Sequence, residues 1–406
     1  MMNRSTSRLQ RHCGLLVVTV SFGLLSSLVT ICNAAESHVA SVNVADPASQ
    51  RAGAPVVGAY YYPWYGVNDR PLEHDWDHVM RRKLAPSQAP LAGLYRSDDP
   101  QVISQHIEQS KRAGIDFWAV SWWGPDTATD RTIRDSILKH PDADQLRYAI
   151  LYEATGRLGS FDNPDYRHLV DDFAYLEKNY FSDANYLHVD GKPVVFIYLT
   201  REYFRNRGHA ELAALRKRVK NVFIVGDDVF GGEYRPEWAK QFDAVTSYDI
   251  YGQSTSQHQA TIKAVEVLAS NYANARRAAN SVGTAFIPAV APGYNDTAER
   301  PGHPGTARYI INDSNSKEGD LFRAMIRQAA LPHLDSACGR LMMVTSFNEW
   351  YEDSQIEPTV GNQPATLQDS SESGTFYTMG DRYADYGPLY LDILAEEIRS
   401  RRSSVE

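Results

Sequence analysis

The amino-acid sequence predicts an α/β protein built as a single (β/α)8 TIM barrel. Apolar runs rich in β-branched and aromatic residues alternate with amphipathic helical stretches, as expected of a parallel sheet covered by helices. Eight such runs fall within the roughly 370 residues that follow an N-terminal apolar segment, which favours a closed barrel over an open doubly wound sheet. The first run leads into Tyr61-Tyr62-Pro63-Trp64-Tyr65-Gly66. No Gly-rich phosphate loop stands there, which argues against a dinucleotide-binding fold.

Each element is placed by its own pattern. The predicted strands are, in order, Val56–Tyr62, Phe117–Trp122, Tyr148–Tyr152, Val194–Tyr198, Val222–Val225, Ala244–Ser247, Ala285–Ala289 and Leu341–Thr345. Helical periodicity predicts the helices Val102–Ala113, Arg131–Lys139, Tyr166–Asn179, His209–Val219, Pro236–Lys240, Gln257–Asn280, Asp320–Ala330 and Leu389–Ser400. The helix after the fifth strand, Pro236–Lys240, has the weakest pattern.

The N-terminus has the pattern of a secretory signal peptide. Three arginines precede the apolar run Gly14 to Ile31, and the small residues Asn33-Ala34-Ala35 follow it. We therefore predict a signal at 1–35, a linker at 36–53, the (β/α)8 barrel domain at 54–401 and a short tail at 402–406, in a protein that is secreted or periplasmic. An uncleaved membrane anchor is the alternative, but several Ser and Thr residues within the run weaken it.

Composition limits the function classes. The formal charge is −9 and the basic residues are scattered, so nucleic acid is not expected as a partner. Only Cys338 remains beyond the signal, so the fold must rest on its core without an internal disulfide. The 24 Tyr and 7 Trp match the apolar faces and hydroxyl rims of sugars, although many of these rings must simply fill the core.

Candidate site residues are sought just beyond each strand, because barrel enzymes assemble their active sites at the C-terminal ends of the strands. These positions are rich in aromatic and acid/base side chains, although any single Asp or Asn among them is as readily a helix cap. The candidates for substrate contact are Tyr61, Tyr62, Trp122, Trp123, Glu153, Tyr251, Tyr294 and Asn348.

Glu349 and Glu352 are the strongest catalytic candidates. They follow the eighth strand within Ser346-Phe347-Asn348-Glu349-Trp350-Tyr351-Glu352. A carboxylate among aromatic rings is partly desolvated, which raises its pKa toward a value useful for proton donation. Glycoside hydrolysis needs two carboxyl groups, one to protonate the leaving oxygen and one to act on the other side of the sugar. Glu-x-x-Glu also occurs on solvated helices, so the position after the eighth strand carries the interpretation.

A metal site at His74 and His78 is the competing hypothesis. On a helix the two imidazoles would share one face. The residue after His74 is Asp75 rather than the Glu of a zinc-protease motif, and no second His-rich strand end joins the pair. We therefore expect neither a metal nor another cofactor.

The sequence resembles glycoside hydrolase family 99, the endo-α-mannosidases and endo-α-mannanases. The resemblance is carried by ordered blocks that span nearly the whole chain after the signal, and the last block is the most specific. The blocks are Tyr60 to Gly66, Ala119 to Gly124, Tyr152-Glu153, Gly191-Lys192-Pro193, Ala291 to Asp296 and Thr345 to Pro358.

This resemblance implies a retaining, endo-acting barrel enzyme that uses no metal. Glu352 would be the general acid/base, and Glu349 would deprotonate the substrate's own 2-hydroxyl, which attacks the anomeric carbon to give a 1,2-anhydro sugar. Trp123 would line the subsite beside the cleaved sugar, as in the bacterial mannan-cutting members. Glu153, Tyr251, Tyr61 and Tyr62 would contact the cleaved sugar.

The expected activity is therefore cleavage of α-1,2-mannosidic linkages in α-mannan or a mannose-rich oligosaccharide, with no membrane partner beyond the export signal. Two departures from the family pattern flank the glutamates and bear on subsite preference. Tyr351 stands where the family usually has His, and Asp353-Ser354 replaces Gly-Thr. The alternative function is a non-catalytic carbohydrate-binding or glycan-assembly barrel of related fold.

Overall fold

The computed structural model describes residues 39–44, 54–66, 74–251 and 259–402, all within the compact unit His38–Glu406. The predicted signal peptide, residues 1–35, lies outside the described residues, as does most of the predicted linker at 36–53. The described part of that linker contacts the barrel, since the Ala40 amide donates to the Ser336 carbonyl and Val42 pairs with Val189. Among the residues that the structure describes, no helix is both long and apolar enough to cross a membrane.

The strands form a parallel barrel. Hydrogen bonding runs in the order β8-β7-β6-β5-β3-β2-β1-β10-β9. These strands are β1 (Val56–Tyr61), β2 (Phe117–Trp122), β3 (Arg147–Tyr152), β5 (Lys192–Ile197), β6 (Phe223–Asp227), β7 (Ala244–Thr246), β8 (Ala285–Phe286), β9 (Ala289–Val290) and β10 (Leu341–Val344). All eight predicted strands are confirmed. A further short strand, β4 (His188–Val189), pairs antiparallel with β5 and was not predicted.

The ring closes through the seventh predicted strand. Its two halves, β8 and β9, pair with β7 and β10 respectively, and only Ile287 and Pro288 separate them. The Ile287 amide still donates to the Val245 carbonyl at 2.9 Å, and the Pro288 carbonyl accepts from the Met343 amide at 2.9 Å. The strand is interrupted here because proline has no N–H to donate to the ladder.

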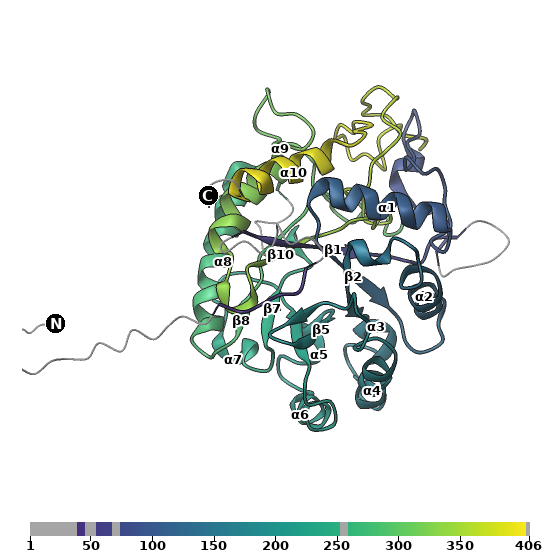
Figure 1. Ribbon diagram of the computed structural model, residues 1–406. Helices are drawn as coiled ribbons and strands as arrows, with labels where there is room; N and C mark the ends of the chain where they lie inside the picture. Colours follow the sequence, from purple (N-terminus) through teal and green to yellow (C-terminus); the bar gives the residue numbers. More distant parts are fainter. Residues whose placement is uncertain (1–38, 45–53, 67–73, 252–258, 403–406) are drawn as a thin grey trace, which may run out of the picture. The chain divides into compact units, whose positions relative to one another are not determined.

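Helices surround the strands, as Figure 1 shows. They are α1 (Pro100–Ala113), α2 (Ala128–Arg131), α3 (Ala154–Arg157), α4 (Leu169–Asn179), α5 (Thr200–Tyr203), α6 (His209–Arg218), α7 (Pro236–Ala239), α8 (Ile262–Asn280), α9 (Asp320–Ala324) and α10 (Leu389–Arg402). The predicted second and seventh helices continue past α2 and α9 as π-helical segments, Thr132–Ile137 and Met325–Ala330. The short helices α3 and α5 were not predicted.

Local chemistry fixes the ends of α1. The Asp99 side chain accepts from the Gln101 amide, and Pro100 takes the first helical position, where a missing N–H is harmless. Gly114 follows with φ 79°, the left-handed conformation that glycine adopts readily. The helix therefore begins and ends at residues whose side chains favour those positions.

Alternation along the strands divides the core into two layers. On β2, the Trp118 and Trp122 indoles point outward and donate to Ser110 and Asp130 at 2.9 and 2.7 Å. Phe117 points inward, where its ring lies so close to Gly58 that a Cβ on residue 58 would stand 2.1 Å from the ring.

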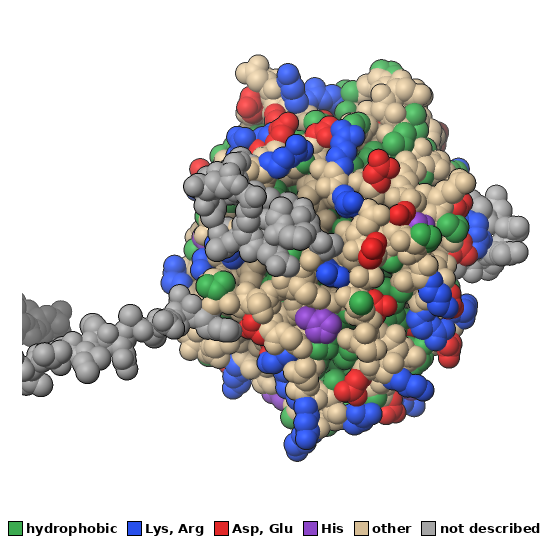
Figure 2. Space-filling view, viewed as in Figure 1, with side chains coloured by type: hydrophobic (Ala, Val, Ile, Leu, Met, Phe, Trp, Pro, Cys, Tyr) green, Lys and Arg blue, Asp and Glu red, His purple; other side chains and the backbone are tan. Residues whose placement is uncertain are grey.

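On the face shown in Figure 2, acidic and basic side chains are interspersed.

Candidate active site

The segment after β10 carries both catalytic candidates on a firmly anchored loop. The Ser346 hydroxyl accepts from the Glu349 amide at 2.7 Å, and the Tyr65 hydroxyl accepts from the Trp350 amide at 2.9 Å. The Trp350 indole donates to the buried Glu357 carboxylate at 2.7 Å. The loop therefore holds the glutamates on either side of a fully buried tryptophan.

Glu349 is almost completely enclosed, with 2% of its surface exposed. One carboxyl oxygen accepts from the Tyr351 amide at 3.0 Å, and the other has no hydrogen-bond partner among the described residues. Burial raises the pKa of Glu349 well above its ordinary value, and the neighbouring Glu352 and Glu153 carboxylates raise it further. Such a carboxylate is a strong proton acceptor once it is ionised.

Glu352 is more open and has two donors. Its side chain is 20% exposed, and its carboxyl oxygens accept from Tyr248 Oη and Arg300 Nη2, each at 3.0 Å. Burial raises the pKa of Glu352, while the Arg300 cation and the Tyr248 hydrogen bond act against the rise. Two adjacent carboxyl groups with raised pKa values favour retention of one proton between them.

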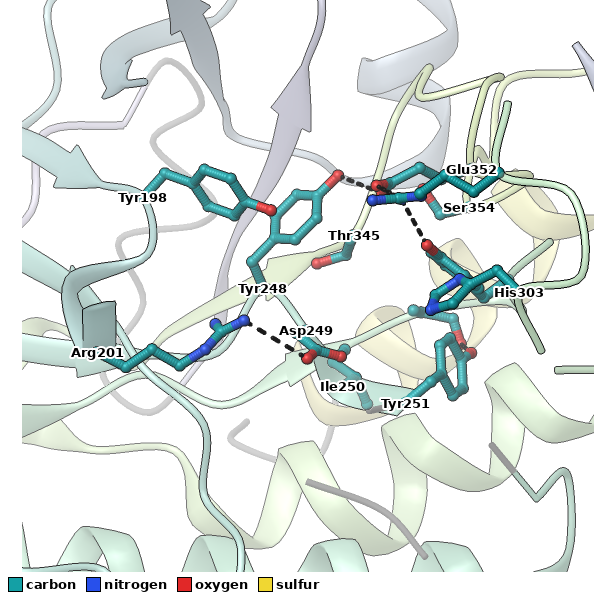
Figure 3. A pocket seen from close by; sticks show the side chains of 13 residues that line it. Tyr198, Arg201, Tyr248, Asp249, Ile250, Tyr251, His303, Thr345, Glu352 and Ser354 are labelled. Atoms are coloured by element: carbon teal, nitrogen blue, oxygen red, sulfur yellow. Dashed lines mark hydrogen bonds and ion pairs between the residues drawn. The ribbon is translucent and has the colours of Figure 1, made fainter. Parts of the chain in front are cut away.

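A cavity of about 190 Å³ opens beside Glu352, and Glu349 is not among the residues that line it. Figure 3 shows Tyr248 pointing toward Glu352, with a dashed line for their hydrogen bond. The lining residues follow the C-terminal ends of β5, β7, β9 and β10: Tyr198, Arg201, Tyr248, Asp249, Ile250, Tyr251, Ala291, Tyr294, Arg300, His303, Thr345, Glu352 and Ser354. The cavity is therefore at the end of the barrel where the sequence predicted the site.

Five of the eight predicted substrate-contact residues lie at this centre. Tyr251 and Tyr294 line the cavity with ring centroids 6.5 Å apart. Tyr62 lies among carboxylates, because Glu153, Glu349 and Glu352 all raise the pKa of its hydroxyl in addition to burial.

The half-buried Trp123 joins this group through a short chain of hydrogen bonds. Its indole donates to the Ser121 hydroxyl at 3.0 Å, which in turn donates to Glu153 at 2.7 Å. Trp123 and Glu153 therefore belong to the half of the site that contains Glu349.

For the other three residues, direct contact with a substrate is not supported. Tyr61 points away from the cavity, stacks on Trp118 at 4.1 Å and is hydrogen-bonded to His106 at 3.0 Å. Trp122 is fully buried against the helix layer. Asn348 is also fully buried, where its amide donates to the Tyr62 carbonyl and accepts from the Tyr62 amide, so it positions Tyr62.

Sequence reasoning missed the two partners of Glu352. Tyr248 comes just after β7, where the strand-end rule places site residues, but only Tyr251 was predicted from that loop. Arg300 lies in a charged stretch, Glu299-Arg300, that reads as a solvated loop. In the structure Arg300 is 53% exposed and pairs with Asp296 as well as Glu352. No local signal marks it.

The competing hypothesis of a metal site needed His74 and His78 on one helical face, and the structure has no helix at residues 74–78. His74 forms a bridge with Tyr65, and the following residues make a turn. The His74 ring is stacked on Tyr351 and tilted against Trp64, with centroid distances of 4.8 and 4.1 Å, while His78 pairs with Glu299 at 3.1 Å. Within the described ranges, no three His, Cys, Asp or Glu side chains are grouped as metal ligands.

Tyr351, which departs from the family pattern, faces this histidine. Its ring lies nearly parallel to His74, at 8°, and its hydroxyl donates to the Asp75 carbonyl at 2.8 Å. The next departure, Asp353, is buried between Arg81 and Arg308, at 2.5 and 3.1 Å. Both substitutions are therefore accommodated by specific contacts.

Comparisons with known proteins give one consistent result. Residues 54–371 match the model of glycosyl hydrolase family 99. A glycoprotein endo-alpha-1,2-mannosidase of Rattus norvegicus is 26% identical over 374 residues, covering 83% of this chain and 73% of that protein. A Homo sapiens glycoprotein endo-alpha-1,2-mannosidase-like protein is 27% identical over 340 residues, covering 76% and 69%.

Among solved structures, a family 99 endo-alpha-mannosidase from Bacteroides thetaiotaomicron superposes with a TM-score of 0.59 at 22% identity, covering 86% of this chain and 98% of that one. At this identity the likeness concerns the fold, and it agrees with the barrel described above.

Proposed function

This chain belongs to glycosyl hydrolase family 99 and is a glycoside hydrolase; from that premise we propose that it is a retaining endo-α-1,2-mannosidase acting on mannan or mannose-rich glycans. The observation that carries the proposal is the glutamate pair after β10, in which Glu349 is buried and Glu352, 20% exposed, lines the cavity. Mannose specificity is supported by similarity to the endo-alpha-1,2-mannosidase of Rattus norvegicus and the endo-alpha-mannosidase of Bacteroides thetaiotaomicron.

We propose that the first step forms a 1,2-anhydro sugar. Glu349 takes the proton of the substrate's 2-hydroxyl, and that oxygen attacks C1 as the bond from C1 to the leaving oxygen breaks. Glu352 gives its proton to the leaving oxygen. An α-mannoside suits this step because its axial 2-hydroxyl lies trans to the leaving group and can displace it in line.

The second step returns both protons. Glu352 takes a proton from water as the water oxygen bonds to C1, and the bond between C1 and O2 breaks. O2 regains its proton from Glu349, so both glutamates end as they began. The enclosed Glu349, with its raised pKa, suits the exchange with the 2-hydroxyl, and Glu352 at the cavity suits contact with the leaving group and then with water.

The test compares Glu349→Gln and Glu352→Gln on an α-mannan oligosaccharide. Each is expected to lose at least about a thousandfold in activity with an unchanged thermal unfolding transition. The matched control is Glu266→Gln, which changes an exposed carboxylate on α8 paired with Lys263, and it should cleave normally. Near-normal turnover by either site variant would overturn the assignment, whereas mannan binding without hydrolysis by the wild type would favour a non-catalytic binding barrel.

The anomer released first tests the stereochemistry. Two displacements at C1 give the α-anomer as the initial product, which NMR can identify. A β-anomer as the initial product would refute the anhydro-sugar route.

We also propose that residues 54–401 are the catalytic domain and that the protein is exported after cleavage of residues 1–35. N-terminal sequencing of the mature protein checks this, and retention of the first residues in an exported or membrane fraction would contradict it.

A further inference from the structure

We propose that Asp353 is a positioning residue for Glu352. Its ion pairs with Arg81 and Arg308 hold the turn of the catalytic loop. That turn sets where the Glu352 carboxyl meets Tyr248. This inference rests on the proposed function, in which Glu352 is the acid/base.

Asp353 turns its side chain away from the cavity. Its neighbours in the chain, Glu352 and Ser354, both line the cavity, whereas Asp353 is not among the lining residues and its side chain is 1% exposed. The Asp353 amide donates to the Trp350 carbonyl at 3.3 Å and closes a turn that contains Glu352. A change at Asp353 therefore alters the placement of Glu352 without removing a group from the cavity.

The backbone of Asp353 has a conformation that its side chain alone does not favour. Its φ is 47°, in the left-handed region, where a side chain other than that of glycine is disfavoured. The family pattern has Gly at this position, and Gly adopts the left-handed region without steric cost. In this chain the turn therefore depends on contacts made by the aspartate.

Two buried arginines supply those contacts. Arg81 Nε donates to Asp353 Oδ1 at 2.5 Å, and Arg308 Nε donates to Oδ2 at 3.1 Å. Arg308 Nη2 also donates to the Asp353 carbonyl at 2.5 Å, so one guanidinium holds both the side chain and the backbone of the turn. Burial acts to raise the pKa of Asp353, but the Arg308 and Arg81 cations lower it below its ordinary value. Asp353 is therefore held as a carboxylate.

The arginines are themselves fixed in place. Arg81 Nη1 donates to Gln88 Oε1 at 2.5 Å. The Arg308 guanidinium lies over the Tyr386 and Tyr390 rings, 5.2 and 5.0 Å from their centroids. Neither arginine side chain is more than 1% exposed, so solvent ions screen these charges little.

Glu352 takes the position that this turn gives it. Its carbonyl accepts from the Asn295 amide at 2.7 Å, and its carboxyl oxygens accept from Tyr248 and Arg300, each at 3.0 Å. Hydrogen bonds weaken steeply as their angle departs from linear. A small rotation of the backbone at Asp353 is therefore enough to weaken the Tyr248 contact.

The experiment measures the cost of Tyr248→Phe in two backgrounds, with an α-mannan oligosaccharide as substrate. In the wild type we expect this substitution to lower kcat/KM by about 10- to 30-fold. Asp353→Asn keeps the shape of the side chain and removes its charge, which weakens both ion pairs. It should lower kcat by about 10- to 30-fold and change KM by less than about threefold. Tyr248→Phe should then cost less than about threefold more, because the two residues act through one contact.

The pH profile gives an independent readout. Loss of the Tyr248 hydrogen bond raises the pKa of Glu352, so the alkaline limb of kcat/KM should move to higher pH in Asp353→Asn. The loss of a nearby negative charge, by itself, would move the limb to lower pH. The direction of the movement therefore distinguishes positioning from a direct effect of charge.

Glu318→Gln is the matched control. Glu318 is largely buried and lies 3.9 Å from Arg81 in the same cluster, and it accepts from the Tyr390 hydroxyl at 2.7 Å. The substitution removes a carboxylate from the cluster but leaves the turn at Asp353 in place. The alkaline limb should not move, and Tyr248→Phe should cost as much as in the wild type.

The other outcomes overturn the positioning role. A full cost of Tyr248→Phe in Asp353→Asn, or an alkaline limb that stays or moves to lower pH, would mean that Asp353 does not act through Glu352. The same behaviour in Glu318→Gln as in Asp353→Asn would indicate a general structural effect. If Asp353→Asn does not fold, Arg308→Lys serves in its place, because lysine keeps the charge but lacks the fork of donors.

Failure of the proposed function has a different result. A wild type that cleaves no α-mannan would refute the proposed function. A wild type that cleaves, a Glu352→Gln variant that does not, and an Asp353→Asn variant with normal kcat would refute the positioning role alone.

Discussion

Replacing Tyr248 with Phe removes one oxygen atom and one hydrogen bond to Glu352. The hydroxyl lies 3.0 Å from the carboxylate, and the Tyr248 side chain is buried, so no bulk water replaces it freely. A hydrogen bond to a charged group contributes about 1.5–3 kcal/mol. Glu352 becomes a carboxylate when it has protonated the leaving oxygen, so the loss falls on the transition state. Because a fifth of the Glu352 side chain is exposed, we expect the lower part of that range, a fall in kcat/KM of about 10- to 30-fold.

The pH profile separates this explanation from a general disturbance. A donor that binds the ionised form lowers a carboxyl pKa, so its removal raises the pKa of Glu352. The general acid must be protonated, and the alkaline limb of kcat/KM against pH should therefore move to higher pH in Tyr248→Phe. Initial rates on an α-mannan oligosaccharide between pH 4 and pH 10 measure it.

Tyr251→Phe is the matched control. It removes the same atom from the same cavity, but from a hydroxyl that donates to the Ala291 carbonyl at 2.6 Å and to neither glutamate. Its alkaline limb should stay in place whatever happens to KM. An unmoved limb in Tyr248→Phe, or one moved to lower pH, would refute the role given to Tyr248.

Three further outcomes are expected. The exposed Arg300 cation lowers the pKa of Glu352, so Arg300→Gln should also move the alkaline limb to higher pH. Added salt screens this cation and should move the wild-type limb in the same direction, but it should leave the limb of the variant in place. Burial raises the pKa of Asp227 to about 7 from an ordinary 3.8. The protonated Asp227 therefore stabilises the fold fully below about pH 4, and this contribution is lost as pH rises through 7. The free energy of unfolding in urea should fall by on the order of 4 kcal/mol over that range, and Asp227→Asn should lack this fall. Gly58→Ala should lower the free energy of unfolding by about 1–3 kcal/mol or more, measured in urea, because the new Cβ would meet the Phe117 ring at 2.1 Å; an unchanged midpoint would contradict this.

The strand and helix positions were predictable because their signals are local. Each strand is a short apolar run, and the helices repeat their apolar residues with helical periodicity, so all eight strands were located from the sequence. The two glutamates were found for a related reason. In a parallel barrel every strand ends at the same face, and residues after the eighth strand must lie there whatever the rest of the chain does.

The local sequence pattern did not predict the interruption of the seventh strand. The run Ala285–Ala289 reads as one strand, but Pro288 within it has no N–H, and pairing passes from β7 on one side to β10 on the other. The apolar pattern alone does not distinguish that arrangement from a continuous strand.

What the sequence by itself determined is the barrel, its order of elements and the two carboxyl groups at its C-terminal end. Which aromatic residue faces the site was decided only in three dimensions, because adjacent strand residues point to opposite sides. Tyr62 lies among the carboxylates while Tyr61 packs under α1, and the same holds for Trp123 and Trp122. The hydrogen-bond partners of Glu352 were also decided by the tertiary structure. Tyr248 and Arg300 lie 104 and 52 residues away along the chain, and only closure of the barrel brings their side chains to one carboxylate.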